Sequence, residues 1–181
     1  MTLQKFLTWD AASSQKLRLR QTKGAAHLTA AFLAHSGDSW FWLLGLFIVW
    51  LLRVPDWHRR TGLLAAGIIA LAVMVLTIKR SVRRQRPAGE WGAIYRATDP
   101  HSFPSGHAAR AALLAVMACG LGPAWFAAAV VCWTPLVSLA RVVMGVHYLS
   151  DVLAGTVLGV VVGALALAVS PWLVGLLPWA F

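Results

Sequence analysis

The sequence predicts an all-α membrane protein: a polytopic bundle of five or six transmembrane helices with an interfacial helix at the N-terminus. Three observations lead to this prediction. Of the 181 residues, 59% are hydrophobic and only 12% are charged, which is about half the charged fraction of an average soluble domain. The apolar residues form long blocks, several of which approach the roughly 20 residues that cross a bilayer. Basic and tryptophan residues flank these blocks, as they do at membrane interfaces.

The N-terminal segment, residues 1–38, is predicted to lie at the membrane surface. Residues 1–24 are basic and weakly amphipathic, so Phe6, Leu7 and Trp9 could contact lipid while lysine and arginine meet headgroups. A disordered basic tail is the alternative. The basic residues inside this run also argue against a cleavable signal peptide. Residues 25–35 are apolar but too few to cross the bilayer, which suggests an interfacial or re-entrant helix or an extension of the next helix.

Five segments are predicted to cross the membrane. They are apolar, they end at polar residues or at Gly-Pro breaks, and they comprise residues 39–52, 62–78, 107–121, 124–139 and 152–169. The last segment carries Gly155, Gly159 and Gly163 at a spacing of four. This spacing either allows close helix contact or simply belongs to a glycine-rich buried helix.

The charge balance narrows the possible partners. Lys and Arg number 16 and Asp and Glu number 6, a formal net charge of +10. Basic loops beside anionic lipid headgroups account for such a charge, and an anionic substrate would add to it. Nucleic-acid binding is disfavoured, because the cations flank apolar spans and no nucleic-acid module is present. Cys119 and Cys132 lack metal-ligand spacing and are expected to pack as small apolar residues.

Polar residues cluster in three places along the second half of the chain. They are residues 79–87 (KRSVRRQRP), 104–107 (PSGH) and 141–151 (RVVMGVHYLSD). These clusters fall at the end of one span, the start of the next, the end of the third and the start of the last. In an up-and-down bundle those four helix ends face the same side, so the topology predicts one shared site. The connection over residues 80–104 is long, and long loops in compact chains are usually functional.

The residues of these clusters suit an anion. Lys79, Arg86 and Arg141 supply three cations near one membrane depth, where an unpaired charge is costly. A phosphate group would balance them, because arginine and lysine match its oxygens. Ser105 and Gly106 precede a helix whose free N-terminal amides could also bind an anion, although plain N-capping by Ser105 is the alternative.

Two histidines and one aspartate add possible chemistry to this anion site. His147 and Asp151 are four residues apart and would share one helix face. Asp151 could hold one imidazole nitrogen and leave the other free to attack phosphorus. His107 would then act as the general acid on the leaving oxygen, and water would hydrolyse the phosphohistidine. A helix-packing hydrogen bond is the alternative for either histidine alone, but their convergence with three cations favours a site.

A metal centre is disfavoured at this site. Two-metal phosphatases need several carboxylates, and the only acids after residue 56 are Glu90, Asp99 and Asp151. The surrounding cations would also repel a divalent ion. We therefore expect neither a metal nor another cofactor.

The three motifs together resemble the type 2 phosphatidic acid phosphatase family. Its pattern is Lys-x6-Arg-Pro, Pro-Ser-Gly-His and Ser-Arg-x5-His-x3-Asp, and this chain matches it except that Ala140 replaces the usual serine. The resemblance implies a single membrane-embedded phosphatase domain over residues 1–181, with its catalytic helices and loops in residues 62–169. It implies that Lys79, Arg86, Arg141, Ser105 and Gly106 hold the phosphate, His107 protonates the leaving group, His147 attacks and Asp151 assists. The apolar spans exclude the family's soluble haloperoxidases and acid phosphatases.

The resemblance also implies the substrate class and the location. A site at a bilayer face suits a lipid phosphate or pyrophosphate, and the small size resembles bacterial undecaprenyl pyrophosphate phosphatases of the inner membrane. Phosphatidylglycerophosphate or phosphatidate is an alternative substrate, and a non-enzymatic transporter of phosphate esters is an alternative of another class. Four further cations, Arg80, Arg83, Arg84 and Arg96, could favour a diphosphate, but a solvated basic loop at the headgroups is the preferred interpretation.

The side of the membrane depends on the number of spans. With five spans, the N-terminus and the site share a side, and the positive-inside rule places that side in the cytoplasm. With six spans, the N-terminal cations join those near residue 53 and the site faces outward. The resemblance favours the outward alternative.

Overall fold

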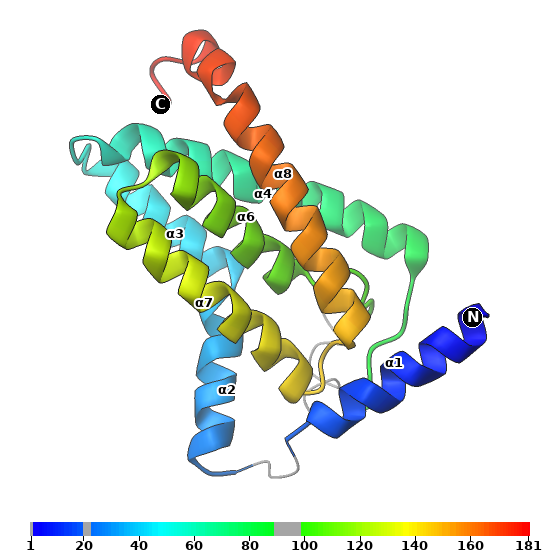
Figure 1. The fold of residues 1–181 in the computed structure, drawn as a ribbon. Coiled ribbons are helices and arrows are strands. Elements are labelled where there is room, and N and C mark those ends of the chain that lie inside the picture. Colours follow the sequence, from blue (N-terminus) through cyan, green and yellow to red (C-terminus); the bar gives the residue numbers. More distant parts are fainter. Residues whose placement is uncertain (1, 20–22, 89–98) are drawn as a thin grey trace.

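The computed structural model describes residues 2–19, 23–88 and 99–181, and these residues are almost entirely helical. The helices are α1 (Leu3–Leu17), α2 (Ala25–Ser36), α3 (Ser39–Leu51), α4 (Trp57–Val82), α6 (Gly106–Leu121), α7 (Ala124–Val143) and α8 (Leu149–Leu176). Helices α3, α4, α6, α7 and α8 run side by side as a bundle, and α1 and α2 lie at one end of it (Figure 1). The predicted all-α membrane bundle is thereby confirmed.

The helices cover all five predicted spans. Three of them, α4, α7 and α8, are long and apolar enough to cross a membrane. Helices α2 and α3 meet the same criterion only as a pair, bent by 56°, so residues 25–36 extend α3 beyond a break. Helix α6 is apolar but has only 16 residues. The exact number of spans therefore stays a prediction.

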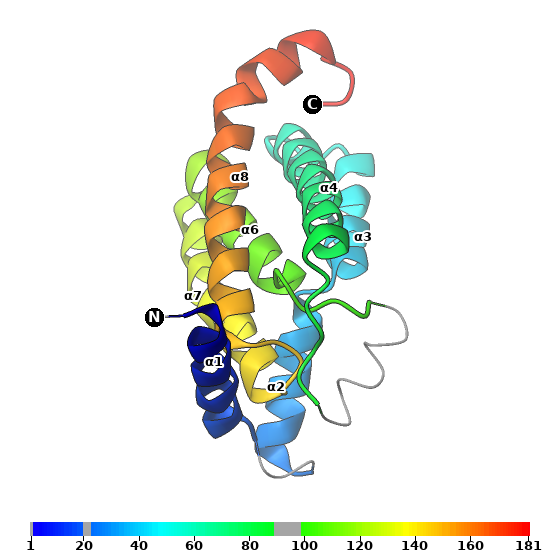
Figure 2. The same ribbon diagram turned by 90° about the vertical axis from the view of Figure 1, so that its right-hand side faces the viewer.

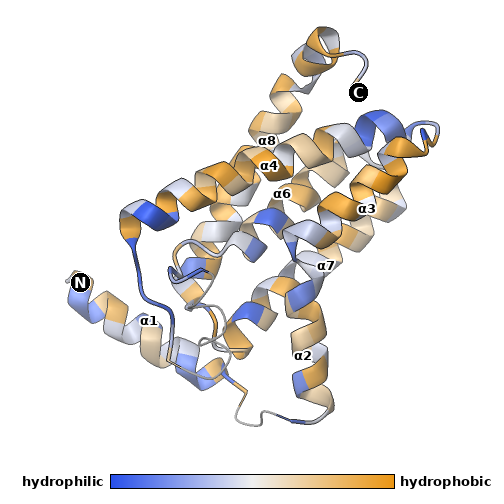
Figure 3. Cartoon of the chain, turned by 180° about the vertical axis from the view of Figure 1, so that it is seen from behind, coloured by the Kyte–Doolittle hydropathy of each residue, from blue (hydrophilic) through white to orange (hydrophobic). Residues whose placement is uncertain are grey.

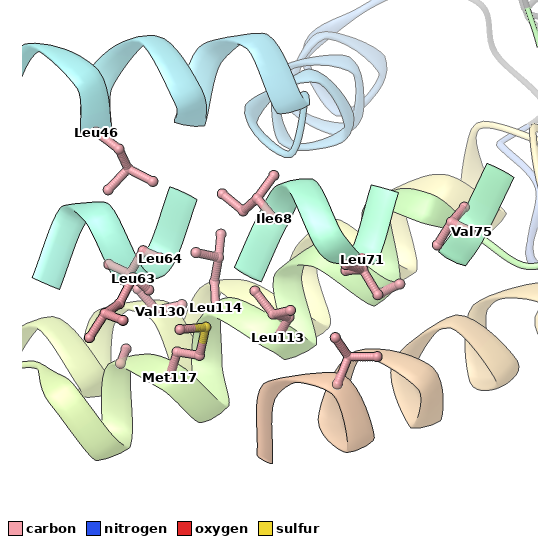
Figure 4. Packing of buried hydrophobic residues seen from close by; sticks show 13 residues of the cluster. Leu46, Leu63, Leu64, Ile68, Leu71, Val75, Leu113, Leu114, Met117 and Val130 are labelled. Atoms are coloured by element: carbon pink, nitrogen blue, oxygen red, sulfur yellow. The ribbon is translucent and has the colours of Figure 1, made fainter. Parts of the chain in front are cut away.

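The main core lies between α4 and α6. Residues three and four apart on each helix form one buried stripe, and these stripes interlock along Leu64, Ile68, Leu71, Leu113, Leu114 and Met117 (Figure 4). Large apolar side chains are also exposed on the outside of the bundle, and the colouring of Figure 3 marks most of α3 and α4 as hydrophobic. That surface suits lipid rather than water. Cys119 and Cys132 are free and exposed, so they do not pack in the core.

Helices α6 and α8 approach so closely that glycine is required between them. A Cβ atom on Gly155 would overlap the carbonyl oxygen of Ser105, and one on Gly159 would overlap that of Ala109. This confirms that the glycines at a spacing of four allow close helix contact. The contact also joins the N-terminal ends of the two helices, where the Ser105 amide donates to the Asp151 carbonyl oxygen over 2.9 Å.

Helix α1 packs across the end of the bundle, beside the start of α8 and the end of α7 (Figure 2). Leu3, Leu7 and Trp9 are exposed on it, whereas Asp10 and Ser14 are buried. The helix favours the interfacial interpretation over a disordered tail. It also places the N-terminal segment at the same end of the bundle as the predicted site, the arrangement expected for five spans.

Candidate functional site

The predicted site residues come together at the end of the bundle nearest α1. Lys79 lies in the last turn of α4 and Arg141 in the last turn of α7. Ser105 is the N-cap of α6, and Gly106 and His107 begin that helix. Asp151 lies in the first turn of α8, whereas His147 lies in the turn before it, because the helix begins only at Leu149. The prediction that these two residues share one helix face is therefore wrong. One cavity of about 200 Å³ is lined by six of the eight candidates: Lys79, Arg86, Gly106, His107, Arg141 and His147. The other two, Ser105 and Asp151, are fully buried beside it.

The imidazole of His147 is buried between Arg86 and Asp151. Its Nε2 lies 3.1 Å from Nη1 of Arg86, and because a guanidinium only donates, the lone pair must be on Nε2. Its Nδ1 therefore carries the proton and faces Oδ2 of Asp151 at 3.5 Å, slightly longer than an ordinary hydrogen bond. Burial and the charges of Arg141, Arg86 and Lys79 hold the pKa of His147 well below 6.5, so the imidazole is neutral at pH 7.

An acidic side chain occupies the middle of the cation cluster. Asp99 Oδ2 lies 2.5 Å from Nζ of Lys79 and 2.8 Å from Nη2 of Arg86. The backbone carbonyls of His101 and Val146 accept further bonds from the same two cations. The Asp99 carboxylate thus satisfies the cations as an anionic ligand would. Sequence reasoning counted Asp99 only as a scattered acid, and its sole signal was its place in the long 80–104 connection.

His107 has its own carboxylate partner. Its Nε2 lies 2.6 Å from Oδ1 of Asp38, a residue in the break between α2 and α3, which orients the ring. Arg110, one turn further along α6, donates to the carbonyl oxygen of Gly37 in the same break. Sequence reasoning missed Asp38, although an isolated acid at the start of an apolar run was a visible signal.

The start of α6 is capped by Ser105. Its hydroxyl accepts the Ala108 amide over 3.5 Å, and its own amide donates to the Asp151 carbonyl, so both groups bond within the protein, as the N-capping alternative expected. The backbone of Gly106 lines the cavity. Ala140, where the family pattern has serine, is buried against α2.

The cations of the basic loop have different environments. Arg80 and Arg83 are exposed, in agreement with a solvated loop. For Arg84 that interpretation is wrong, because its side chain is only 16% exposed and donates to Oδ1 of Asp151 over 2.7 Å. The reason is tertiary, since α1 and α8 close over this side chain. Arg96 lies outside the described residues.

Within the described ranges, no three His, Cys, Asp or Glu side chains gather as a metal site requires. Glu90, one of the acids considered above, falls outside those ranges. A reaction without metal therefore stays a prediction.

Comparison with known proteins agrees with the motifs. The pattern of the PAP2 superfamily matches residues 60–174. Decaprenylphosphoryl-5-phosphoribose phosphatase of Mycobacterium tuberculosis (strain ATCC 25618 / H37Rv) is 35% identical over 138 residues, which cover 76% of each chain. The enzyme of the same name from Mycolicibacterium smegmatis is 33% identical over 127 residues, covering 70% of this chain and 69% of the relative.

Two solved structures share the fold. A transmembrane PAP2-type phosphatidylglycerolphosphate phosphatase from Bacillus subtilis superposes with a TM-score of 0.75 at 23% identity, over 92% of this chain and 87% of its own. Aquifex aeolicus LpxE superposes with a TM-score of 0.65 at 22% identity, over 85% and 93% respectively. Together with the sequence match over residues 60–174, these likenesses show that the chain belongs to the PAP2 superfamily and is an integral membrane protein of this lipid phosphatase family.

Proposed function

We propose that this protein hydrolyses the phosphate monoester of a polyprenyl-linked lipid in a bacterial inner membrane, through a phosphohistidine on His147 and without a metal. The observation that carries the proposal is the shared cavity. In it, the lone pair of His147 and the side chain of His107 lie together with three buried cations. A phosphate group bound there would meet a nucleophile, an acid and its counter-ions at once.

The reaction would proceed in two steps. Nε2 of His147 attacks phosphorus as the bond to the lipid oxygen breaks, and His107 gives that oxygen a proton. Water then attacks phosphorus as the bond from phosphorus to Nε2 breaks, His107 takes a proton from the water, and inorganic phosphate leaves. Arg86, which occupies the lone pair of His147 in this structure, would turn to the phosphate oxygens when substrate binds.

Two observations favour a monoester over the pyrophosphate considered from the sequence. The relatives that match most of the chain are named for a phosphoribose attached to decaprenyl phosphate. In addition, Arg84 already bonds Asp10 and Asp151, so it is not a spare cation for a second phosphate. Undecaprenyl pyrophosphate, phosphatidylglycerophosphate and phosphatidate are the competing substrates.

The test is phosphate release by the purified protein in detergent with a chelator present. The panel comprises a polyprenyl phosphoribose phosphate and the three competitors. We expect release without metal, fastest from the phosphoribose lipid, and a loss of at least about a thousandfold in kcat for His147→Gln. His58→Gln, at the opposite end of the bundle, is the matched control.

Hydrolysis retained by His147→Gln would remove the nucleophile from the proposal. Activity that appears only when a divalent ion is restored would refute the metal-free reaction. Transport of a phosphate ester without its hydrolysis would favour the transporter alternative.

A further inference from the structure

We propose that Asp10 of α1 is a positioning residue for the reaction, and that it acts through Arg84 on the Asp151–His147 pair. The inference rests on the proposed role of His147. It gives α1 a part in catalysis, whereas its sequence suggested only a helix on the membrane surface.

Asp10 is a buried carboxylate whose side-chain bonds, among the described residues, all go to Arg84 and to the first turn of α8. Its side chain is 0% exposed, which for a charged group demands partners. Oδ2 accepts from Nη2 of Arg84 over 2.7 Å and from the hydroxyl of Ser150. Oδ1 accepts from the Ser150 amide over 3.1 Å, in the first turn of α8. A carboxylate that served only to hold α1 on the membrane would not be enclosed in this way.

Arg84 relays this contact to the catalytic pair. Its Nη1 donates to Oδ1 of Asp151 over 2.7 Å, and its guanidinium lies 4.0 Å from the ring centre of Tyr148. The second oxygen of Asp151 accepts from the Tyr148 amide over 2.9 Å and faces Nδ1 of His147. Charged contacts therefore run from α1 through Arg84 to Asp151, and the Asp151 carboxylate lies 3.5 Å from the imidazole.

The charges of this chain explain why a second carboxylate is needed. Arg84 and Asp151 alone would form a neutral pair, with no net negative charge to oppose the cations Lys79, Arg86 and Arg141 around His147. With Asp10, two carboxylates share one guanidinium and the cluster carries a net charge of −1. When Nε2 bonds to phosphorus the imidazole becomes cationic, and this negative charge stabilises it. Asp10 should therefore lower the barrier to attack more than it improves substrate binding.

Helix α1 offers a matched control four residues further along the same face. The Ser14 hydroxyl accepts the Leu149 amide over 2.9 Å, so it also ties α1 to the start of α8. Ser14 makes no contact with Arg84 among the bonds of the described residues. Ser14→Ala loosens the docking of α1 and leaves the charge cluster intact.

The experiment compares Asp10→Asn, Ser14→Ala and the double variant Asp10→Asn/Arg84→Gln as full-length proteins in detergent. For Asp10→Asn we expect kcat to fall about 10- to 100-fold while KM stays within about threefold. The acid limb of kcat/KM should also move to lower pH, because loss of the negative charge of Asp10 disfavours protonation of His147. The other charges that face His147 stay in place: Lys79 on α4, Arg86, Arg141 on α7 and Asp151 on α8. Ser14→Ala should change kcat less than about threefold.

The double variant distinguishes two roles of Asp10: supplying negative charge near His147, and holding α1 against α8. It restores a net charge of −1 through Asp151 alone, which keeps its bond from the Tyr148 amide, so we expect a kcat above that of Asp10→Asn. Where Asp10→Asn does not fold, the double variant is compared with wild type instead, and a loss of kcat greater than about 100-fold would overturn the inference. A double variant no faster than Asp10→Asn, or equal losses in Asp10→Asn and Ser14→Ala, would overturn the inference. Full activity of Asp10→Asn beside an inactive His147→Gln would reject this inference alone, whereas an active His147→Gln would reject the proposed function.

Discussion

Asp99→Asn should make the protein bind phosphate more tightly. In the structure the Asp99 carboxylate bonds Lys79 at 2.5 Å and Arg86 at 2.8 Å, so an incoming phosphate group must displace it from both cations. The substitution removes the negative charge and keeps nearly the same side-chain volume. It therefore leaves the two cations without their internal competitor.

The size of the effect follows from the contacts. A buried hydrogen bond to a charged group contributes about 1.5–3 kcal/mol. The Asp99 side chain is 40% exposed, however, and solvent screening reduces the contribution of an exposed ion pair to at most about 1 kcal/mol. The two bonds together then oppose phosphate by about 1–2 kcal/mol. Since about 1.4 kcal/mol corresponds to tenfold, the affinity should rise about 5- to 30-fold.

The assay is competitive inhibition by inorganic phosphate and by vanadate, measured together with the KM of the lipid substrate. For Asp99→Asn we expect inhibition constants and KM to fall by this factor, with kcat within about twofold. Asp56→Asn, an exposed aspartate beside the start of α4, removes the same charge away from the cavity and should change nothing. If Asp99→Asn binds phosphate no better than wild type, the carboxylate orients the cations instead of competing for them.

Three further predictions concern packing, pH and orientation. Gly155→Ala should lower the melting temperature by several degrees, because overpacking costs about 1–3 kcal/mol. Gly175→Ala, where the added methyl group meets open space, should not lower it. Equal melting temperatures of the two variants would contradict close contact of α6 and α8. The pKa of His147 lies well below 6.5, and protonation removes the lone pair that attacks phosphorus. Once the ionisation of the substrate itself is corrected for, the acid limb of kcat/KM should therefore lie below pH 6.5. Stability should also decline as pH falls below 6.5, because the unfolded chain takes up this proton first; an acid limb above pH 6.5 speaks against a depressed pKa. Finally, a cysteine at Arg83, in a background without native cysteines, should react with an impermeant reagent only in inverted vesicles, because the site and the basic α1 share one end of the bundle; labelling of intact cells would place the site outside.

The candidate cavity could be predicted from the sequence because its members sit at helix ends. An apolar run lies before or after each of them: Lys79, Arg86, His107, Arg141 and His147. In an antiparallel bundle the end of one helix and the start of the next lie on the same side, so these residues must come together. Local spacing was sufficient for this prediction. The glycines of α8 left two interpretations open, and the structure decided for close contact with α6.

What only the tertiary structure decided is which carboxylates complete the site. Asp10, Asp38 and Asp99 come from α1, from the α2–α3 break and from the long connection. The side chains and amides of the site that they bond lie 13 to 140 residues away in the chain. On α1, Asp10 and Ser14 look in the sequence like the solvent-facing side of an amphipathic helix. Only the packing of α1 against α8 shows that this side is buried. Sequence alone determined the main helices, the order of their ends and the residues that we propose to bind phosphate. The pairing of their charges depends on how the N-terminal helices fold back across the bundle, and hydrophobic periodicity carries no information about that.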